Sequence, residues 1–318
     1  MPLGPAFRVD PPSMPAQRSP QSGNLPLMRC APALVLLLAA PQTALAAFPE
    51  RLSVLAMEDF DGARTESFEG DDYVAAGWKQ VVLELGSTVS NKPVAPARTL
   101  GPAGFHVDVG TTFAHLPGRW LDGSTPDGWE LMDPDEEAPA LLYVPTVHVR
   151  KGLPASLEVG ANFGWLGSTE TGIVGGYGRI GLLEGYPKFP DVSLQAGYSA
   201  YIGNDEFELG AMDFLANIGY TLPFGPVEGI HTARFSPFVS FGLTRIHATP
   251  RVDLTDTRLD GRLIELTGFE GDNFDETLAP FTFAGGFEVQ SGTFTFLLSS
   301  GYAVGGAVTF NLGTGFTY

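Results

Sequence analysis

AVTFNLGTGFTY, residues 307–318, alternates large apolar side chains with small or polar ones along its length. Successive side chains of a β-strand point to opposite faces, so this stretch predicts a strand with one apolar and one polar face. At the edge of a soluble sheet, such a strand would invite aggregation. A barrel closed in lipid removes that edge, because its last strand pairs with its first, and it needs an apolar outer face and a polar lumen.

The same alternation of apolar with small or polar residues recurs in several segments from residue 104 onward. After residue 46 no apolar run reaches the roughly 20 residues of a membrane helix, although the mean hydropathy is +0.08 and the chain contains 23 Phe. We therefore predict an all-β fold, a transmembrane antiparallel up-and-down β-barrel of about ten strands, with eight or twelve strands as alternatives. The expected strands are 105–113, 143–150, 156–165, 173–182, 192–201, 211–220, 237–248, 281–289, 293–302 and 307–318.

The terminal strand also carries a sorting motif. It ends in Phe316, Thr317 and Tyr318, and this Phe-x-Tyr ending resembles the assembly signal of Gram-negative outer-membrane β-barrel proteins. The resemblance implies that the barrel-assembly machinery recognises Phe316 and Tyr318. It further implies a location in the bacterial outer membrane, with outer-membrane lipid and lipopolysaccharide as partners.

The connections between the expected strands alternate in length. If the first strand runs outward, the two longest connections, 116–140 and 249–278, both face outside, as in outer-membrane barrels with long outer loops and short periplasmic turns. Both are rich in Asp and Glu. These acidic loops support an alternative function, a barrel that binds a ligand, a divalent ion or a partner at the cell surface.

The N-terminal region is typical of a targeting segment. Residues 28–46 contain Arg29, a short apolar core and an A-x-A pattern at 44–46, which together indicate a secretory signal peptide. Residues 1–27 are Pro-rich and fit a disordered leader or a mis-called start. The one cysteine, Cys30, lies within the signal, so the mature chain is expected to have no thiol, disulfide or cysteine metal site.

Between the signal and the barrel (103–318), residues 47–102 are expected to form a periplasmic or plug segment. Asp71 and Asp72 can cap a helix over about 73–85, although 81–85 also fits an extra strand. The Pro-containing stretch 91–102 is typical of a linker.

The charge of the chain excludes one class of partner. The formal net charge is −18, and nucleic-acid binding needs basic patches, so we expect no nucleic-acid partner.

Ionisable residues recur on the polar faces of the expected strands. A barrel of about ten strands is narrow, so side chains of both signs in its lumen are expected to pair into a packed network. A selective path for a small solute is the alternative. The candidates are His106, Asp108, His148, Arg150, Glu158, Arg179, Asp213 and Glu288.

We predict no catalytic residue, metal site or cofactor. His106 and Asp108 share a face, but a His–Asp pair needs a nucleophile or bound water to act. An omptin-like or lipid-modifying enzyme is the remaining alternative, and it would depend on His247 or His148. The sequence favours a porin-like path for small solutes or a structural role in the envelope.

Overall fold

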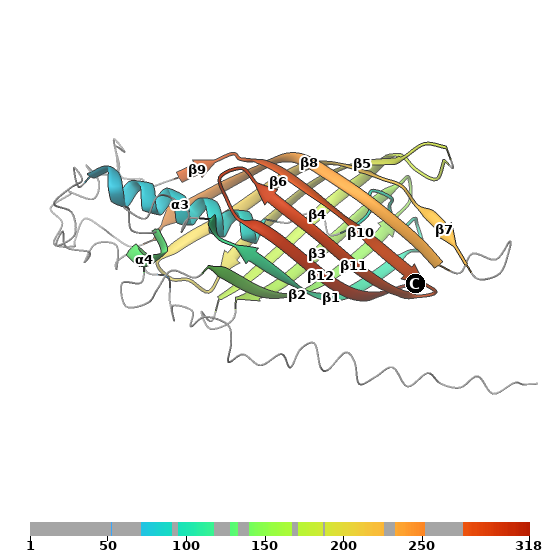
Figure 1. The fold of residues 1–318 in the computed structure, drawn as a ribbon, viewed down its shortest axis with the longest axis horizontal. Helices are drawn as coiled ribbons and strands as arrows, with labels where there is room; N and C mark the ends of the chain where they lie inside the picture. Colours follow the sequence, from blue (N-terminus) through green and yellow to red (C-terminus); the bar gives the residue numbers. More distant parts are fainter. Residues whose placement is uncertain are drawn as a thin grey trace, which may run out of the picture. The chain divides into compact units, whose positions relative to one another are not determined.

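The computed structural model describes residues 52, 71–90, 95–117, 128–132, 140–166, 171–186, 188–225, 233–251 and 276–318. Ten long strands form a barrel wall (Figure 1). They are β1 (Phe105–His115), β2 (Leu141–Leu153), β3 (Leu157–Leu166), β4 (Thr171–Leu183), β5 (Asp191–Ile202), β6 (Phe207–Gly219), β8 (Ala233–Pro250), β10 (Phe281–Ser291), β11 (Phe294–Ala303) and β12 (Val308–Thr317).

The wall closes on itself. Each strand pairs antiparallel with the next, β8 pairs with β10, and β12 pairs with β1 from His106 opposite Thr317 to His115 opposite Val308. At the seam, Phe105 N–H donates to Tyr318 O at 2.9 Å, and Tyr318 N–H donates to Phe105 O at 2.8 Å. The predicted ten-stranded barrel, with its last strand paired to its first, is confirmed.

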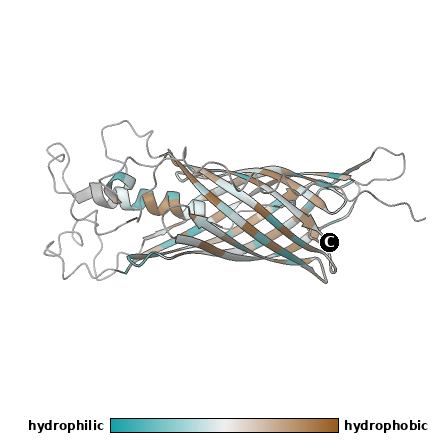
Figure 2. Cartoon of the chain, turned by 90° about the horizontal axis from the view of Figure 1, so that it is seen from below, coloured by the Kyte–Doolittle hydropathy of each residue, from teal (hydrophilic) through white to brown (hydrophobic). Residues whose placement is uncertain are grey.

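The two faces of the wall carry opposite chemistry. In β5, Ser193 and Ser199 are fully buried, whereas Leu194 and Tyr198 are 47% and 53% exposed. Figure 2 shows the same alternation of hydrophobic and hydrophilic residues around the barrel. A soluble protein buries its apolar side chains instead, so an apolar outer wall around a polar interior indicates a barrel that faces lipid. Exposed apolar side chains of the wall include Val159, Phe163, Ile180, Phe214, Val239, Phe241, Phe283 and Phe310.

The two ends of the barrel differ in their connections. One end, which we call the turn end, holds Phe105, Tyr318 and the short turns at 154–156 and 292–293. The opposite end, which we call the loop end, gives rise to the two longest connections, from β1 to β2 and from β8 to β10. The two longest connections therefore lie at the same end of the barrel, as predicted from the sequence.

Two short strands were not predicted. β7 (Leu222–Phe224) pairs with the first residues of β8, and β9 (Glu276–Leu278) pairs with Ile246, His247 and Ala248 near its last residues. β8 is 18 residues long, so each of its ends has room for an extra partner beside the wall. A strand of three residues shows too little alternation to be recognised from sequence.

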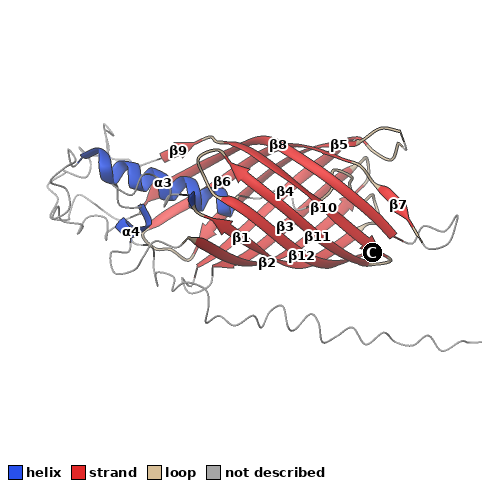
Figure 3. Cartoon of the chain, viewed as in Figure 1, coloured by secondary structure: helices blue, strands red, loops and turns tan. Residues whose placement is uncertain are grey.

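Helix α3 (Asp71–Val89) lies at the loop end, as does the short helix α4 (Gly128–Met132) (Figure 3). The helix predicted over 73–85 is confirmed and is longer, and the alternative strand over 81–85 is wrong. Trp78 stacks edge-on against Phe207 at the start of β6, with ring centroids 5.6 Å apart. Within the part of the chain described, no helix is long and apolar enough to cross a bilayer.

Candidate functional site

The lumen contains the predicted ionisable residues. His148 and Glu288 are half-buried, and the other six are buried. His106, Asp108 and His148 form one cluster. Glu158 and Arg179 pair between neighbouring strands, and Arg150 and Glu288 pair across the lumen. Asp213 makes a separate contact. The buried six are His106, Asp108, Arg150, Glu158, Arg179 and Asp213.

Two histidines share the carboxylate of Asp108. Asp108 Oδ2 lies 3.0 Å from His106 Nε2, and Asp108 Oδ1 lies 2.8 Å from His148 Nδ1. His106 Nδ1 also hydrogen-bonds Thr317 Oγ1 at 2.7 Å. This cluster connects β12, β1 and β2, so it ties together the two strands that close the barrel.

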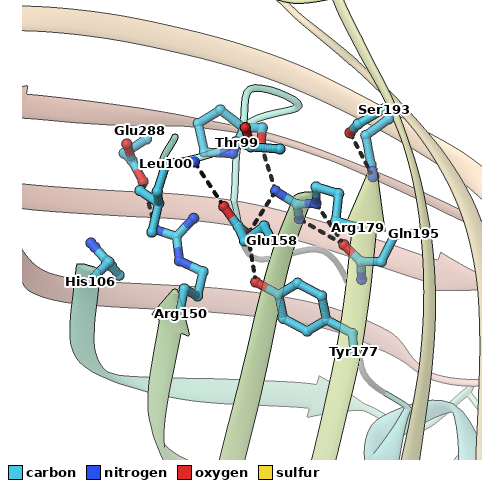
Figure 4. A network of polar contacts seen from close by, with 12 residues as sticks. Thr99, Leu100, His106, Arg150, Glu158, Tyr177, Arg179, Ser193, Gln195 and Glu288 are labelled. Atoms are coloured by element: carbon cyan, nitrogen blue, oxygen red, sulfur yellow. Dashed lines mark hydrogen bonds and ion pairs between the residues drawn. The ribbon is translucent and has the colours of Figure 1, made fainter. Parts of the chain in front are cut away.

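Glu158 on β3 is fully buried and is surrounded by donors (Figure 4). Its Oε1 lies 3.5 Å from Arg179 Nη1 and accepts the Tyr177 hydroxyl at 3.0 Å. Its Oε2 accepts the backbone N–H of Leu100 at 3.1 Å. One carboxylate therefore holds two wall residues and one residue from outside the wall.

Arg179 on β4 is held from several sides. Its Nε and Nη2 donate to Gln195 Oε1 at 3.1 and 2.7 Å, and its Nη1 donates to the Pro96 carbonyl at 2.9 Å. A guanidinium presents donors in a fixed planar fork, so these partners define its orientation within the lumen.

Arg150 and Glu288 meet across the lumen. Arg150 Nη2 lies 3.4 Å from Glu288 Oε2, although their strands β2 and β10 are not neighbours in the wall. The alternation along each strand predicts that both residues point inward, but it does not predict their pairing, because the pairing depends on the diameter of the closed barrel.

Asp213 on β6 belongs to a more local contact. Its Oδ1 accepts the Thr244 hydroxyl at 2.6 Å, and Thr244 hydrogen-bonds Thr282 at 2.7 Å. The chain of hydroxyls crosses from β6 through β8 to β10 and gives the buried Asp213 carboxylate a hydrogen-bond donor.

The main feature that sequence reasoning missed is the role of residues 95–104, which we call the strap. The sequence predicted a linker over 91–102, at the end of a segment that was expected to be periplasmic or a plug. The strap lies inside the barrel, where Ala95 and Ala97 are fully buried. Thr99 donates its backbone N–H and its hydroxyl to the two carboxylate oxygens of Glu184, at 2.6 and 3.0 Å. Its small and Pro-rich residues were the available signal, since they fit a narrow space and leave backbone groups for the wall to bind.

Space remains on both sides of the strap. A cavity of about 360 Å³ at the turn end is lined by residues that include Arg98, Arg150, Arg234, Glu184 and Glu288. A smaller cavity of about 30 Å³, room for about one water, lies where the end of α3 faces the wall. The larger of these two cavities is polar and of mixed charge.

The histidines proposed for the enzymatic alternative lie apart. His148 belongs to the Asp108 cluster, while His247 is exposed near the loop end and hydrogen-bonds the Thr277 and Thr249 hydroxyls. Within the described ranges, no group of three or more His, Cys, Asp or Glu is arranged to hold a metal ion. The acidic stretches of the loops 116–140 and 249–278 fall almost entirely outside the described residues.

Phe316 and Tyr318 lie on the outer face at the turn end. Phe316 is 45% exposed and packs edge-on against Phe294, with centroids 6.0 Å apart, and Tyr318 is 72% exposed. Their recognition by the assembly machinery stays a prediction.

Neither a known protein family nor a curated protein matches the sequence. Among solved structures, the N-terminal β-barrel domain of OprF from Pseudomonas aeruginosa is similar at 10% identity over 69% of this chain and 99% of that chain, with a TM-score of 0.28. Ail, the attachment invasion locus protein of Yersinia pestis, is similar at 11% identity over 68% and 99% of the two chains, with a TM-score of 0.27. Omp33 from Acinetobacter baumannii is similar at 9% identity over 68% and 98%, with a TM-score of 0.26.

At this level of likeness, the class of the protein rests on its own geometry. A closed antiparallel barrel with an apolar outer wall, a polar interior, short turns at one end and longer loops at the other is the architecture of bacterial outer-membrane proteins. The chain has the fold of an outer-membrane β-barrel protein, and this fold is consistent with the location in the bacterial outer membrane expected from the sequence. The signal peptide expected at 28–46 lies outside the described residues.

Proposed function

We propose that this barrel is a porin-like path for small solutes that α3 and the strap, residues 71–90 and 95–104, keep shut. The observation that carries the proposal is the way the strap is bound. Backbone groups of Pro96 and Leu100 are hydrogen-bonded to Arg179 and Glu158 inside the lumen, in the half nearer the turn end. The polar groups that would line a solute path are the same groups that hold the strap.

The chemistry of the lumen supports a path over a purely structural role. Burying an ion pair costs several kcal/mol of desolvation per ion, and well-packed apolar residues often stabilise a protein as well or better. A barrel selected only for stability has little use for the buried Glu158 and Arg179. Ionisable walls suit a lumen that takes up water and polar solutes when the strap leaves it.

The mixed charge of the larger cavity indicates the kind of solute. The lining of this cavity has both hydrogen-bond donors and acceptors, because it includes Arg98, Arg150 and Arg234 as well as Glu184 and Glu288. Such a lining favours small polar or zwitterionic solutes over ions of one sign.

Single-channel recording in planar lipid bilayers tests the proposal. The refolded mature chain is expected to be closed for most of the recording. Gly86→Phe is expected to give sustained openings, because even a Cβ at Gly86 would lie 2.3 Å from Cγ2 of the fully buried Ile246 and would push α3 from its seat. A variant whose mature chain begins at Ala103 lacks α3 and the strap bonds of Pro96, Thr99 and Leu100, so it should stay open.

The matched control is Lys79→Ala, which changes an exposed position of α3 and should behave like the parent. Heat-modifiable migration on gels reports whether each variant has folded as a barrel. If the folded deletion variant is silent in the bilayer, solute passage is excluded and only the structural envelope role is left.

A further inference from the structure

Two described segments, α3 with Ser90 and the strap, make contacts that are spread from one end of the barrel to the other. At the turn end, Gly104 O accepts the Gly152 N–H at 3.0 Å, directly before β1 begins at Phe105. Leu100 is bonded to Glu158, the second residue of β3, and β3 also starts at the turn end. The last residues of the strap therefore belong to the turn end.

The next contacts lie farther inside. Pro96 is bonded to Arg179 in the part of β4 that is nearer the turn end. The end of α3 then faces the wall from several sides, since Ser90 shares the small cavity with Thr112, Asn162 and other wall residues. These contacts place the end of α3 within the lumen.

The earlier part of α3 lies at the loop end. Ser87 Oγ accepts the N–H of Ala307, which follows the turn between β11 and β12, at 2.8 Å. Trp78 packs on Phe207 at the start of β6. Leu52, far earlier in the sequence, accepts a hydrogen bond from Asn204 Nδ2 at 2.9 Å, and Asn204 lies between β5 and β6.

From this order of contacts, we infer that the mature chain crosses the membrane through its own barrel before it forms the wall. The loop end is the extracellular end, because outer-membrane barrels carry their longer loops outside and their short turns in the periplasm. Leu52 and the first turns of α3 are then on the outer side, and Phe105 is on the periplasmic side. The barrel displays its own N-terminal region at the cell surface.

This inference is independent of solute passage. A barrel that never conducts still presents its N-terminal region outside if the strap runs through the lumen. A barrel that conducts could do so with its N-terminal region on either side. The two proposals therefore fail in different experiments.

Cysteine labelling on intact cells tests the inference. The one cysteine of the sequence is Cys30, which lies in the predicted signal, so the chain left after export and signal cleavage provides a thiol-free background. Lys79→Cys introduces a thiol at an exposed position of α3, and Arg98→Cys introduces one at an exposed position of the strap beside the turn-end cavity. A maleimide reagent too large to cross the outer membrane should label Lys79→Cys on intact cells and Arg98→Cys only after the outer membrane is permeabilised.

Two further variants fix the orientation of the barrel. Val304→Cys introduces a thiol in the turn between β11 and β12 at the loop end. Thr293→Cys introduces one in the turn between β10 and β11 at the turn end. The first should react on intact cells and the second only after permeabilisation. Ala103→Cys, also exposed, replaces Arg98→Cys if that variant does not fold, as judged by heat-modifiable migration.

Two results would overturn the inference. One is protection of Lys79→Cys on intact cells in which Val304→Cys reacts, since α3 would then not be on the outer side. The other is reaction of Thr293→Cys but not of Val304→Cys on intact cells, since the loop end would then face the periplasm.

Discussion

Phe214→Arg is expected to lower the free energy of unfolding by about 2–4 kcal/mol, the cost of a charged side chain on the lipid face near the bilayer midplane. Phe214 lies near the middle of β6 and is 52% exposed. In a water-soluble protein, a substitution at so exposed a position usually changes stability by less than about 0.5 kcal/mol. Urea titration of the barrel folded in phospholipid vesicles measures the difference.

Phe189→Arg is the matched control. Phe189 is also apolar and is 62% exposed, but it lies in the connection between β4 and β5 at the turn end. Near the membrane interface, the same charge should cost only about 0–1 kcal/mol. Equal losses in the two variants, or a small loss in both, would contradict a lipid-facing wall.

The strands could be predicted because their signal is local. In β3, Val159 and Phe163 point outward and Glu158 points inward simply because they differ in parity along one strand. β4 is Gly-rich and its alternation is ambiguous in phase, and the inward position predicted for Arg179 is the one observed. Closure at the seam followed from the polar and apolar faces of β12, because lipid leaves an unpaired edge without partners.

The strap could not be predicted because it is bound through its backbone. The groups that matter are the carbonyl of Pro96 and the amide of Leu100, and every residue type except Pro offers both kinds of group. Residues inside a lumen also face wall on all sides, so they show neither the period of a strand nor that of a surface helix. The Pro-rich composition of the strap is that of a linker, because composition does not show which wall residues surround a segment.

Partners across the lumen were equally out of reach. Arg150 and Glu288 are far apart in sequence and on strands that do not pair, so their contact is set by the number and tilt of the strands. The inward position of each residue follows from its own strand, but the pair exists only in the closed barrel. Glu184, which binds the strap, lies in the connection after β4. The alternation of side chains along a strand therefore does not predict where it points.

Glu158→Ala is expected to have the largest effect of any change in the lumen, a loss of about 3–5 kcal/mol in the free energy of unfolding. The side chains of Glu158 and Arg179 are 0% and 1% exposed. Removal of the carboxylate leaves the Arg179 cation buried without its anion and leaves the Leu100 N–H without its acceptor. Urea titration measures the stability, and bilayer recording should show more frequent opening because the strap loses the hydrogen bond between Leu100 and the wall.

The exposed pair of Arg251 and Glu208 separates burial from charge pairing. Arg251 donates to the Glu208 carboxylate, but the two side chains are 50% and 60% exposed. Glu208→Ala should therefore cost less than about 1 kcal/mol, because solvent screens the exposed pair. Glu158→Gln should fall between the two, since its amide oxygen can still accept the Leu100 N–H while the charge is lost. If Glu158→Ala were no more damaging than Glu208→Ala, water would already solvate Arg179, and the strap would not close the lumen at that point.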